Sequence, residues 1–336
     1  MEELRKVLEG HTLGEDEAYR LMGAVMAGRL TPAQVAGMLI GLKVRGEAEA
    51  EIAGFARAMR EAARPVPLDG VEALDVVGTG GDGKGTLNLS TASALVAAAA
   101  GVPVAKHGNR AASSKSGSAD VLEALGVPIE LSPEAAARMV REVGFAFLFA
   151  RLYHPAMKHV APVRTELGVR TVFNLLGPLT NPARPAYFLL GVFDPALLEP
   201  MARALAALGV KRALVVHGEG ADELVLGENE VVELAGGELR RYRVRAAELG
   251  LNPAPLEALA GGDPEENADR IRKILAGEEE GPRADAVALN AGAALYAAGR
   301  AESLGAGVER ARALLKEGAP ARLLDRLVEA GRRTQG

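Results

Sequence analysis

Residues 75–126 read DVVGTGGDGKGTLNLSTASALVAAAAGVPVAKHGNRAASSKSGSADVLEALG. The apolar residues 73–77 predict a strand, residues 78–83 a glycine-rich loop, and the alanine-rich run after residues 88–91 a helix. Glycines let successive backbone N–H groups turn toward an anion, and the N-terminus of the following helix adds unpaired N–H groups and a favourable dipole. The stretch therefore predicts a strand, a loop and a helix that together bind phosphate.

Two nucleotide-binding motifs match this loop in part. Gly78, Gly80 and Gly83 have the spacing of the dinucleotide fingerprint G-x-G-x-x-G, which needs an acidic residue about twenty positions later to bind a ribose hydroxyl. The next apolar strand instead ends in Lys106-His107. The P-loop motif needs Ser or Thr where Gly85 stands, because that hydroxyl binds Mg²⁺. Both nucleotide interpretations are therefore disfavoured.

A second polar segment follows the next predicted strand. Lys106-His107-Gly108-Asn109-Arg110 places two cations and an amide at a strand end, which is where ligands bind in open α/β sheets. A serine-rich loop over residues 113–118 then leads into a helix over residues 120–125 that starts at Ser118 or Ala119. A helix start and an anion site can be one object. Together these segments favour a phosphorylated sugar that is held from several sides.

The composition narrows the class of protein. The chain has 336 residues, enough for one large domain and a smaller one or for two comparable domains, and its net charge of −5 implies no general surface for nucleic acid. It has no cysteine, which excludes disulfides and thiolate chemistry and agrees with a cytoplasmic location. The first residues contain no apolar signal core, and no long apolar stretch is free of charge or glycine. We expect neither nucleic acid nor membrane as a partner.

The pattern of helices and strands predicts an α/β fold. Thr31-Pro32-Ala33-Gln34 is a capping box that starts a helix ending at Gly46, and a second helix spans about residues 48–63. Short strands then alternate with helices, which predicts a mostly parallel sheet flanked by helices; the strands are residues 73–77, 102–105, 145–149, 187–192 and 213–217. Two further strands, 230–234 and 238–242, are predicted to form a hairpin. We expect a small all-helical N-terminal domain over residues 1–66 and a larger α/β domain over residues 67–336.

Motifs along essentially the whole chain resemble those of the anthranilate phosphoribosyltransferases of tryptophan biosynthesis. They are residues 78–82, 88–91, 106–110, 113–120, 151–164, 170–182, 222–223 and 290–294. The resemblance implies a fold like that of nucleoside phosphorylases and phosphoribosyltransferases, with a later segment, about residues 163–185, joining the helical domain. It implies transfer of the phosphoribosyl group of 5-phosphoribosyl 1-pyrophosphate (PRPP) to the amine of anthranilate. It also implies a cytoplasmic homodimer joined through the helical domain.

The resemblance assigns residues to both substrates. Those implied for PRPP are Gly78, Gly80, Gly81, Asp82, Thr86, Asn88, Ser90, Thr91, Lys106, Gly108, Asn109, Ser114 and Ser118. Those implied for anthranilate are Gly78, His107, Asn109, His154 and Arg164. A lone arginine such as Arg164 is ordinarily a surface ion-pair residue, although its guanidinium could bind a small carboxylate through two hydrogen bonds. Each histidine could equally be a packed core residue.

The leaving pyrophosphate needs a counter-charge, which Mg²⁺ provides through hard oxygen ligands. Asp222-Glu223 follows a strand end and could supply such ligands or form an ordinary solvated acidic loop. The resemblance supports both as ligands, together with the Ser90 hydroxyl, for two Mg²⁺ ions. No nucleophile and base stand out, so we assign no residue as acid, base or nucleophile. Catalysis is expected to come from positioning, metal-assisted departure of pyrophosphate and exclusion of water.

Two other functions remain open at this point. Pyrimidine nucleoside phosphorylases resemble this chain in fold and glycine loop, but they usually carry a further C-terminal domain, for which this chain has little room, and lack the stretch over residues 154–164. A non-catalytic homologue that binds nucleic acid would need a basic groove and altered metal ligands. Asp222, Glu223 and the acidic net charge argue against that function.

Overall fold

The structure, a computed structural model, describes residues 1–111 and 115–334. Its first four helices are α1 (Glu2–Leu8), α2 (Glu15–Met26), α3 (Pro32–Arg45) and α4 (Glu49–Ala62). The predicted capping box is confirmed at the start of α3. The Thr31 hydroxyl accepts a hydrogen bond from the Gln34 backbone N–H at 3.3 Å, and the Gln34 side chain accepts one from the Thr31 N–H at 3.0 Å. Gly46 ends the helix with a φ of +88°, which only glycine adopts without strain.

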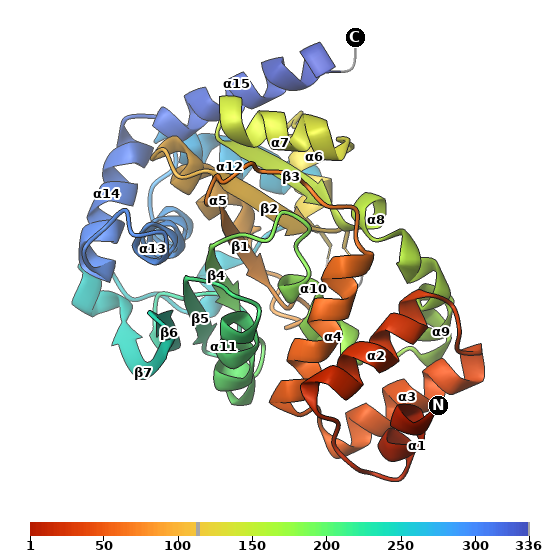
Figure 1. Cartoon of the computed structure of the whole chain (residues 1–336). Helices are drawn as coiled ribbons and strands as arrows, with labels where there is room; N and C mark the ends of the chain where they lie inside the picture. The colour runs from red at the N-terminus through yellow and green to blue at the C-terminus, as the bar shows by residue number, and fades with distance from the viewer. Residues whose placement is uncertain (112–114, 335–336) are drawn as a thin grey trace.

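Seven strands form one sheet in the order β3-β2-β1-β4-β5-β6-β7 (Figure 1). The strands are β1 (Leu74–Gly78), β2 (Val104–Gly108), β3 (Phe145–Phe149), β4 (Tyr187–Gly191), β5 (Arg212–Gly218), β6 (Glu228–Ala235) and β7 (Glu238–Arg245). The five strands β3, β2, β1, β4 and β5 pair in parallel with their neighbours, whereas β6 and β7 add an antiparallel hairpin at one edge. The predicted α/β class with a mostly parallel sheet is confirmed.

The second strand differs from its prediction. β2 begins at Val104 and continues through Lys106 and His107 to Gly108, because these residues pair with residues 147–149 of β3. The expectation that the strand ends at residue 105, with Lys106 and His107 following it, is therefore wrong. Both side chains lie in the body of the sheet, and Lys106 is only 1% exposed.

Most of the remaining helices in the described residues cover the two faces of the sheet. The remaining helices are α5 (Leu89–Ala99), α6 (Ser118–Ala124), α7 (Pro133–Glu142), α8 (Ala150–Tyr153), α9 (Ala161–Leu167), α10 (Phe173–Leu179), α11 (Leu198–Ala207), α12 (Pro264–Ala276), α13 (Pro282–Ala297), α14 (Leu304–Lys316) and α15 (Ala319–Thr334). Adjacent residues of β4 face opposite cores. Leu189 packs in the core that contains α5 and α13, whereas Phe188 and Leu190 pack in the core that contains α11.

A later part of the chain completes the N-terminal helical bundle. Val163 of α9 and Phe173 of α10 belong to the same buried core as Met22 and Phe55 of the first helices. Figure 1 shows α9 beside α1–α4, at a distance from the sheet. We therefore propose the division expected from the sequence, in which about residues 163–185 join residues 1–66 and the rest of residues 67–336 forms the α/β domain.

Three chain segments are joined by hydrogen bonds where the bundle meets the sheet. The backbone N–H of Arg64 donates to the carbonyl oxygen of Tyr153 at 2.8 Å, and that of Val66 donates to Pro182 at 3.2 Å. The buried Arg60 donates through Nε to the carbonyl oxygen of Leu179 at 2.6 Å. These bonds tie the end of α4 to the segments before and after α9 and α10.

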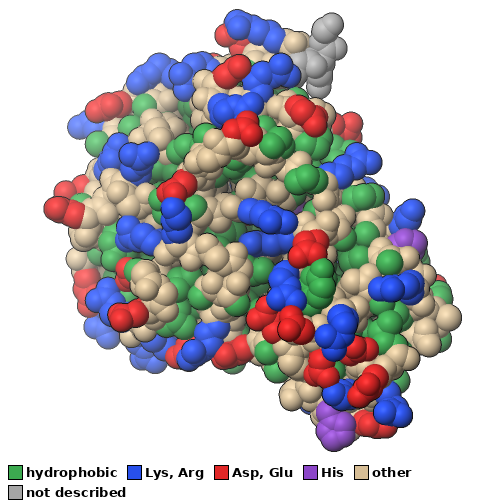
Figure 2. Space-filling model, in the orientation of Figure 1, with side chains coloured by type: hydrophobic (Ala, Val, Ile, Leu, Met, Phe, Trp, Pro, Cys, Tyr) green, Lys and Arg blue, Asp and Glu red, His purple; other side chains and the backbone are tan. Residues whose placement is uncertain are grey.

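Charged side chains of both signs are interspersed over the face drawn in Figure 2. On the outer strand β7, Arg240 pairs with Glu233 at 3.0 Å and Arg241 with Glu230 at 2.7 Å. Such a charged edge strand resists pairing with another sheet. Among the helices of residues 1–111 and 115–334, none is both long and apolar enough to span a membrane.

Candidate active site

A cavity of about 350 Å³ lies at the carboxyl ends of β1 and β2. Segments far apart in the sequence meet there, and the residues proposed for binding that line it are Gly78, Gly80, Gly81, Asp82, Thr86, Asn88, Ser90, Lys106, His107, Gly108, Asn109, Ser118, Asp222 and Glu223. Thr91, His154 and Arg164 do not line it. Ser114 falls outside the described residues. The cavity thus joins the glycine loop, the end of β2, the start of α6 and the acidic pair.

The glycine loop closes tightly on Asp222. The backbone N–H of Gly80 donates to Asp222 Oδ2 at 2.6 Å, and Gly80 adopts a φ of +69°. A Cβ atom on Gly78 would lie 2.2 Å from Asp222 Oδ2, and one on Gly191 would lie 1.6 Å from the Asp222 carbonyl oxygen. Glycine is therefore required at Gly191, where a Cβ atom would meet backbone atoms, whereas at Gly78 it would force the Asp222 carboxylate to move.

Three carboxylates gather at the cavity floor. Glu223 accepts hydrogen bonds from the Thr86 hydroxyl at 3.0 Å and from the Ser90 backbone N–H at 3.2 Å. Burial, followed by the negative charge of Asp82, raises the pKa of Asp222 to about 7. Burial and the charge of Asp222 raise the pKa of Glu223 well above its ordinary value. Like charges held this close favour a bound cation, which would relieve both effects.

One carboxylate oxygen in this group lacks a hydrogen-bond donor. Asp82 Oδ1 accepts from the backbone N–H of Lys84 at 3.0 Å, but the buried Asp82 Oδ2 has no partner in the described part of the chain. Within that same part, no three His, Cys, Asp or Glu residues are grouped so that they could hold a metal ion by themselves. Two or three carboxylates with open positions are the arrangement that suits Mg²⁺, which keeps water and substrate phosphate in its shell. The residues present therefore fit a magnesium site completed by substrate.

Lys106 lies beneath the acidic group. Its Nζ donates to the carbonyl oxygen of Val76 at 2.5 Å and to the Ser90 hydroxyl at 3.3 Å. Burial lowers the pKa of Lys106 to about 8, although the negative charges of Asp75, Glu223 and Asp222 raise it. The sequence analysis placed this cation at a strand end, and the structure holds it within β2 and in the cavity wall next to Ser90.

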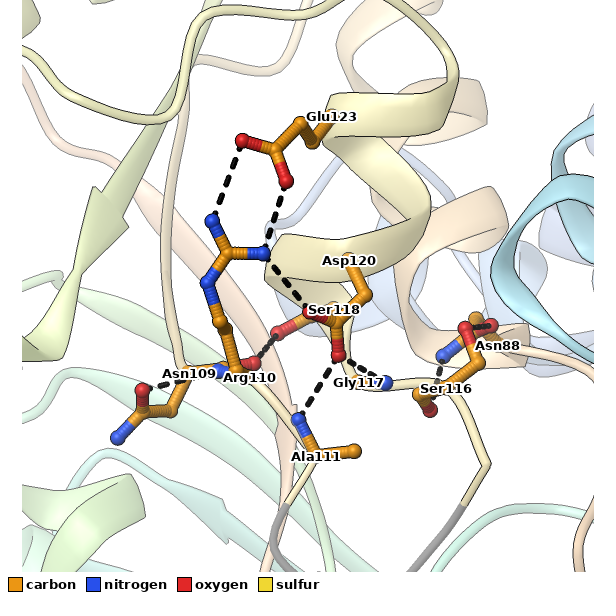
Figure 3. Close-up of polar contacts among 9 residues, drawn as sticks. All are labelled: Asn88, Asn109, Arg110, Ala111, Ser116, Gly117, Ser118, Asp120 and Glu123. Carbon is orange, nitrogen blue, oxygen red and sulfur yellow. Dashed lines mark hydrogen bonds and ion pairs between the residues drawn. The ribbon is translucent and has the colours of Figure 1, made fainter.

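Asp120 binds two described residues that precede α6, Ala111 and Gly117. Its Oδ2 accepts hydrogen bonds from the backbone N–H groups of Ala111 and Gly117, both at 2.9 Å, as Figure 3 shows. Arg110 donates to Asp120 at 2.9 Å and to Glu123 at 2.8 Å. The expectation that Arg110 offers a free cation at the strand end is therefore wrong. Its role here is to fasten the backbone that follows β2 to α6, which begins at Ser118 as predicted.

The two histidines form a buried pair. The Nε2 atoms of His107 and His154 are 3.1 Å apart, and His107 Nδ1 lies 3.2 Å from the carbonyl oxygen of Gly177. His107 Nδ1 can donate to that carbonyl, and the ring of His154 has a hydrogen bond of the same kind with the Thr180 backbone. Burial lowers the pKa of His107 well below its ordinary value and that of His154 to about 4. Both rings are therefore uncharged at neutral pH.

Arg164 lies on α9, across from the cavity. Its guanidinium carbon is 5.4 Å from the centre of the Phe173 ring, and burial lowers its pKa. No carboxylate of the described residues forms an ion pair with it. The ordinary interpretation of a lone arginine, a surface ion pair, thus has no support here. An unpaired, partly buried guanidinium needs an anionic partner.

The sequence analysis gave no role to three polar residues that support the site, Asp75, Asn181 and Asn267. Asp75 is buried in β1 and accepts from Asn181 Nδ2 at 2.8 Å and from the His107 backbone N–H at 3.3 Å. A charged residue inside an apolar strand was the available signal for Asp75. Asn267 of α12 bonds to Asn88 at 2.9 Å, and nothing in its charged helical surroundings marked it.

Two models of known families match the chain. Residues 70–321 match the glycosyl transferase family model described as an a/b domain, and residues 1–63 match the model described as a helical bundle domain. Together with the cavity at the strand ends, these matches define the class as a two-part glycosyl transferase.

Similar proteins narrow the class further. The chain is 61% identical over 328 residues to anthranilate phosphoribosyltransferase from Thermus thermophilus, with 98% of each chain covered. A crystal structure of the Thermus thermophilus enzyme has a TM-score of 0.95 at 60% identity and covers 99% of this chain and 100% of that one. The Saccharomyces cerevisiae enzyme in complex with PRPP and Mg has a TM-score of 0.89 at 26% identity, with 98% and 97% covered. The chain belongs to the anthranilate phosphoribosyltransferase family.

Proposed function

We propose that the cavity at the ends of β1 and β2 is where this chain carries out the reaction of its family. The enzyme transfers the phosphoribosyl group of PRPP to the amine of anthranilate, which gives N-(5-phosphoribosyl)anthranilate and pyrophosphate, a step of tryptophan biosynthesis. The observation that carries the placement is the meeting of the glycine loop, the start of α6 and the pair Asp222 and Glu223 in one cavity.

PRPP is proposed to lie along the glycine loop and the two helix starts. Gly81, Asp82, Asn88 and Ser90 line the cavity and can donate hydrogen bonds there, whereas the N–H groups of Thr79 and Gly80 already donate to Gly191 and Asp222. The Ser118 hydroxyl donates to the Asn109 carbonyl oxygen at 3.3 Å, so its oxygen faces the ligand as an acceptor. Lys106 adds a positive charge from the wall. Thr91 is buried inside α5 and outside the cavity lining, so its proposed role is to support this helix start.

Magnesium is proposed to bind at Asp222, Glu223 and the Ser90 hydroxyl, with two ions for each active site. The raised pKa values of the two carboxyls and the unpartnered Asp82 oxygen support a cation there. When bound, Mg²⁺ neutralises the charge that develops on the departing pyrophosphate. The chain itself contributes orientation of the sugar and exclusion of water from C1.

Anthranilate is proposed to bind between the cavity and α9. Because His107 and His154 are uncharged, only Arg164 among the acceptor residues can neutralise the anthranilate carboxylate. Asn109 and Gly78 line the cavity on the side where the amine must approach C1. The neutral histidine pair would form an apolar wall for the aromatic ring, and no side chain is assigned as a base.

Replacing Arg164 tests the acceptor site. Arg164→Ala is expected to raise the KM for anthranilate about 10- to 100-fold, since a charge-assisted pair contributes about 1.5–3 kcal/mol. The KM for PRPP should change less than about threefold. Steady-state kinetics with each substrate varied in turn measures both values. Arg151→Ala, an exposed arginine on α8, is the matched control, and an unchanged anthranilate KM in Arg164→Ala would reject the assignment.

We further propose that the protein is a homodimer whose interface forms over α1 and α3. We also propose that it is cytoplasmic, since both substrates of this biosynthetic step are small soluble anions. Leu8, Ile40 and Val44 are exposed by 56%, 36% and 81%, although large apolar side chains are usually buried. Leu8 packs beside Gly37 of α3, so the three side chains share one surface. The helical bundle would then be the dimer interface.

Charge placed on this surface tests the dimer. Val44→Glu is expected to shift the protein from dimer to monomer at micromolar concentration, because it would bury an unpaired carboxylate in the interface. Sedimentation velocity measures the change. Val169→Glu alters another exposed apolar residue and should leave the dimer intact. A parent protein that already sediments as a monomer would refute the proposal.

The reaction is tested directly by mixing the protein with anthranilate, PRPP and Mg²⁺ and following the loss of anthranilate fluorescence. Loss that stops when a chelator removes the metal supports the proposed function. Fluorescence that persists with metal present, alongside phosphorolysis of thymidine or uridine or binding of DNA, would contradict it and favour one of the two alternative functions.

A further inference from the structure

The amide of Asn88 is held by hydrogen bonds on both of its sides. Its Oδ1 accepts from Asn267 Nδ2 at 2.9 Å and from the Ser116 hydroxyl at 3.1 Å, and its Nδ2 donates to the Ser116 carbonyl oxygen at 3.1 Å. Figure 3 shows the contacts with Ser116 from the side of the loop. An amide nitrogen has two hydrogens, so one N–H of Asn88 is left for a ligand in the cavity that Asn88 lines.

The orientation of Asn267 is fixed in turn. Asn267 is 1% exposed, its Oδ1 accepts from the Gly262 backbone N–H at 2.7 Å, and its Nδ2 also donates to the Gly262 carbonyl oxygen at 3.3 Å. A backbone N–H can only donate, so the oxygen of Asn267 must face Gly262 and the nitrogen must face Asn88. Asn88 is therefore held with its oxygen away from the ligand and an N–H available to it.

The same region supports the glycine loop from behind. The backbone N–H of Leu87 donates to the carbonyl oxygen of Leu259 at 2.8 Å, and that of Gly261 donates to Gly85 at 2.9 Å. Thr86 and Ala260 form an antiparallel bridge between these segments. Asn267 adds to these contacts, because its side chain bonds both to the Gly262 backbone and to the Asn88 side chain. A displaced Asn267 amide would therefore move residues 85–88 in two ways, directly through Asn88 and indirectly through residues 259–262.

We propose that Asn267 is a positioning residue for the PRPP site, which keeps the Asn88 amide turned so that it donates to an oxygen of the phosphorylated sugar. This inference rests on the proposed function for its ligand and on the hydrogen bonds of Asn267 for its mechanism. Asn267 is not a catalytic residue, since Asn88 lies between it and the cavity.

The Asn267→Asp variant tests this role with almost no change in shape. The carboxylate still accepts from Gly262 but offers Asn88 an acceptor where Nδ2 offered a donor, so the Asn88 amide must turn over or move. The KM for PRPP is expected to rise about 10-fold, since an unmade hydrogen bond at a buried group costs about 1–3 kcal/mol. The KM for anthranilate at saturating PRPP should stay within about twofold.

A double-mutant cycle shows whether the effect passes through Asn88. Asn88→Ala removes the amide that Asn267 is proposed to orient. In that background, Asn267→Asp is expected to raise the KM for PRPP by less than about twofold. Ser132→Ala removes the N-cap hydrogen bond of α7, far from the cavity, and serves as a control that loses stability without a change in either KM.

Calorimetric titration with PRPP and Mg²⁺ separates this proposal from the proposed function. If the parent binds PRPP but does not consume anthranilate, the reaction is wrong and the cycle is repeated on the dissociation constant. Equal effects of Asn267→Asp in the parent and in Asn88→Ala would overturn the positioning role. A parent that binds no PRPP, or a loss of kcat in proportion to the unfolded fraction with both KM values unchanged, would overturn it as well.

Discussion

The Asp222→Asn variant is expected to lose about 100-fold or more in kcat/KM and yet to unfold at a higher temperature than the parent when no metal is present. The loss follows because a metal ligand supports several kcal/mol of charge stabilisation in the transition state, and each 1.36 kcal/mol is a tenfold change in rate. The gain follows because burial and the nearby Asp82 carboxylate raise the pKa of Asp222 to about 7. The amide has no charge to bury.

The stability difference between the parent and Asp222→Asn is expected to depend on pH. In the unfolded chain Asp222 ionises near its ordinary value of 3.8, whereas in the folded protein it holds its proton up to about pH 7. The parent therefore loses stability through Asp222 as the pH rises between these values, and the asparagine variant lacks this contribution while it keeps that of Glu223. The difference in melting temperature should widen from pH 4 to pH 7 and then stay constant. Thermal melts in chelator across this range measure it.

An exposed carboxylate is the matched control. Asp16 is paired with Arg57, and the hydrogen bond from Arg57 lowers its pKa. Asp16→Asn should keep full activity and gain no stability. Parent-like activity in Asp222→Asn, or a melting temperature that falls below that of the parent at pH 8, would contradict the proposed metal site.

Gly191→Ala is expected to lower the free energy of unfolding by about 3 kcal/mol and to lower kcat/KM by more than about 100-fold. The new Cβ atom would lie 1.6 Å from the carbonyl oxygen of Asp222 and 2.3 Å from its carbonyl carbon. Alanine has no rotamer that avoids backbone atoms, so β4 or the acidic loop must move by about an ångström or more. A displacement of that size at a positioned catalytic group costs about two orders of magnitude in rate.

Urea unfolding and steady-state kinetics measure the two effects. Gly23→Ala is the control, since its Cβ would meet no atom within 4 Å and Gly23 lies inside α2. That variant should gain about 0.5–1 kcal/mol from helix propensity and keep its activity. A Gly191→Ala protein with parent-like stability would show that the acidic loop is not held against the strand end.

Local signals explain which parts of the fold could be predicted from the sequence. The capping box at Thr31 and the run of alternating strands and helices depend on residues near one another in the chain, and both predictions are confirmed. The prediction of where β2 ends is wrong because the length of this strand is set by its pairing with β3, about forty residues later in the chain. No local pattern records where a neighbouring strand stops.

The site shows the same division. The glycine loop could be found because successive glycines have few other uses beside a helix start. The ion-pair partners of Arg110 could not be predicted from the sequence, since Glu123 comes close to Arg110 only once α6 has formed. Gly191 and Asn267 are required by contacts with Asp222 and Asn88, which are distant in sequence, so their own surroundings carry no signal.

The helical bundle that joins α1–α4 to α9 and α10 also sets the order in which the chain can fold during synthesis. A ribosome that has released residues 1–62 has made Phe55 and Met22 without Val163 and Phe173, which share their core. The sheet is also incomplete then, because β1 pairs with β4, at residues 187–191. The first helices therefore leave the apolar surface that Val163 and Phe173 later cover exposed until the middle of the chain emerges, so their core is completed only late in synthesis.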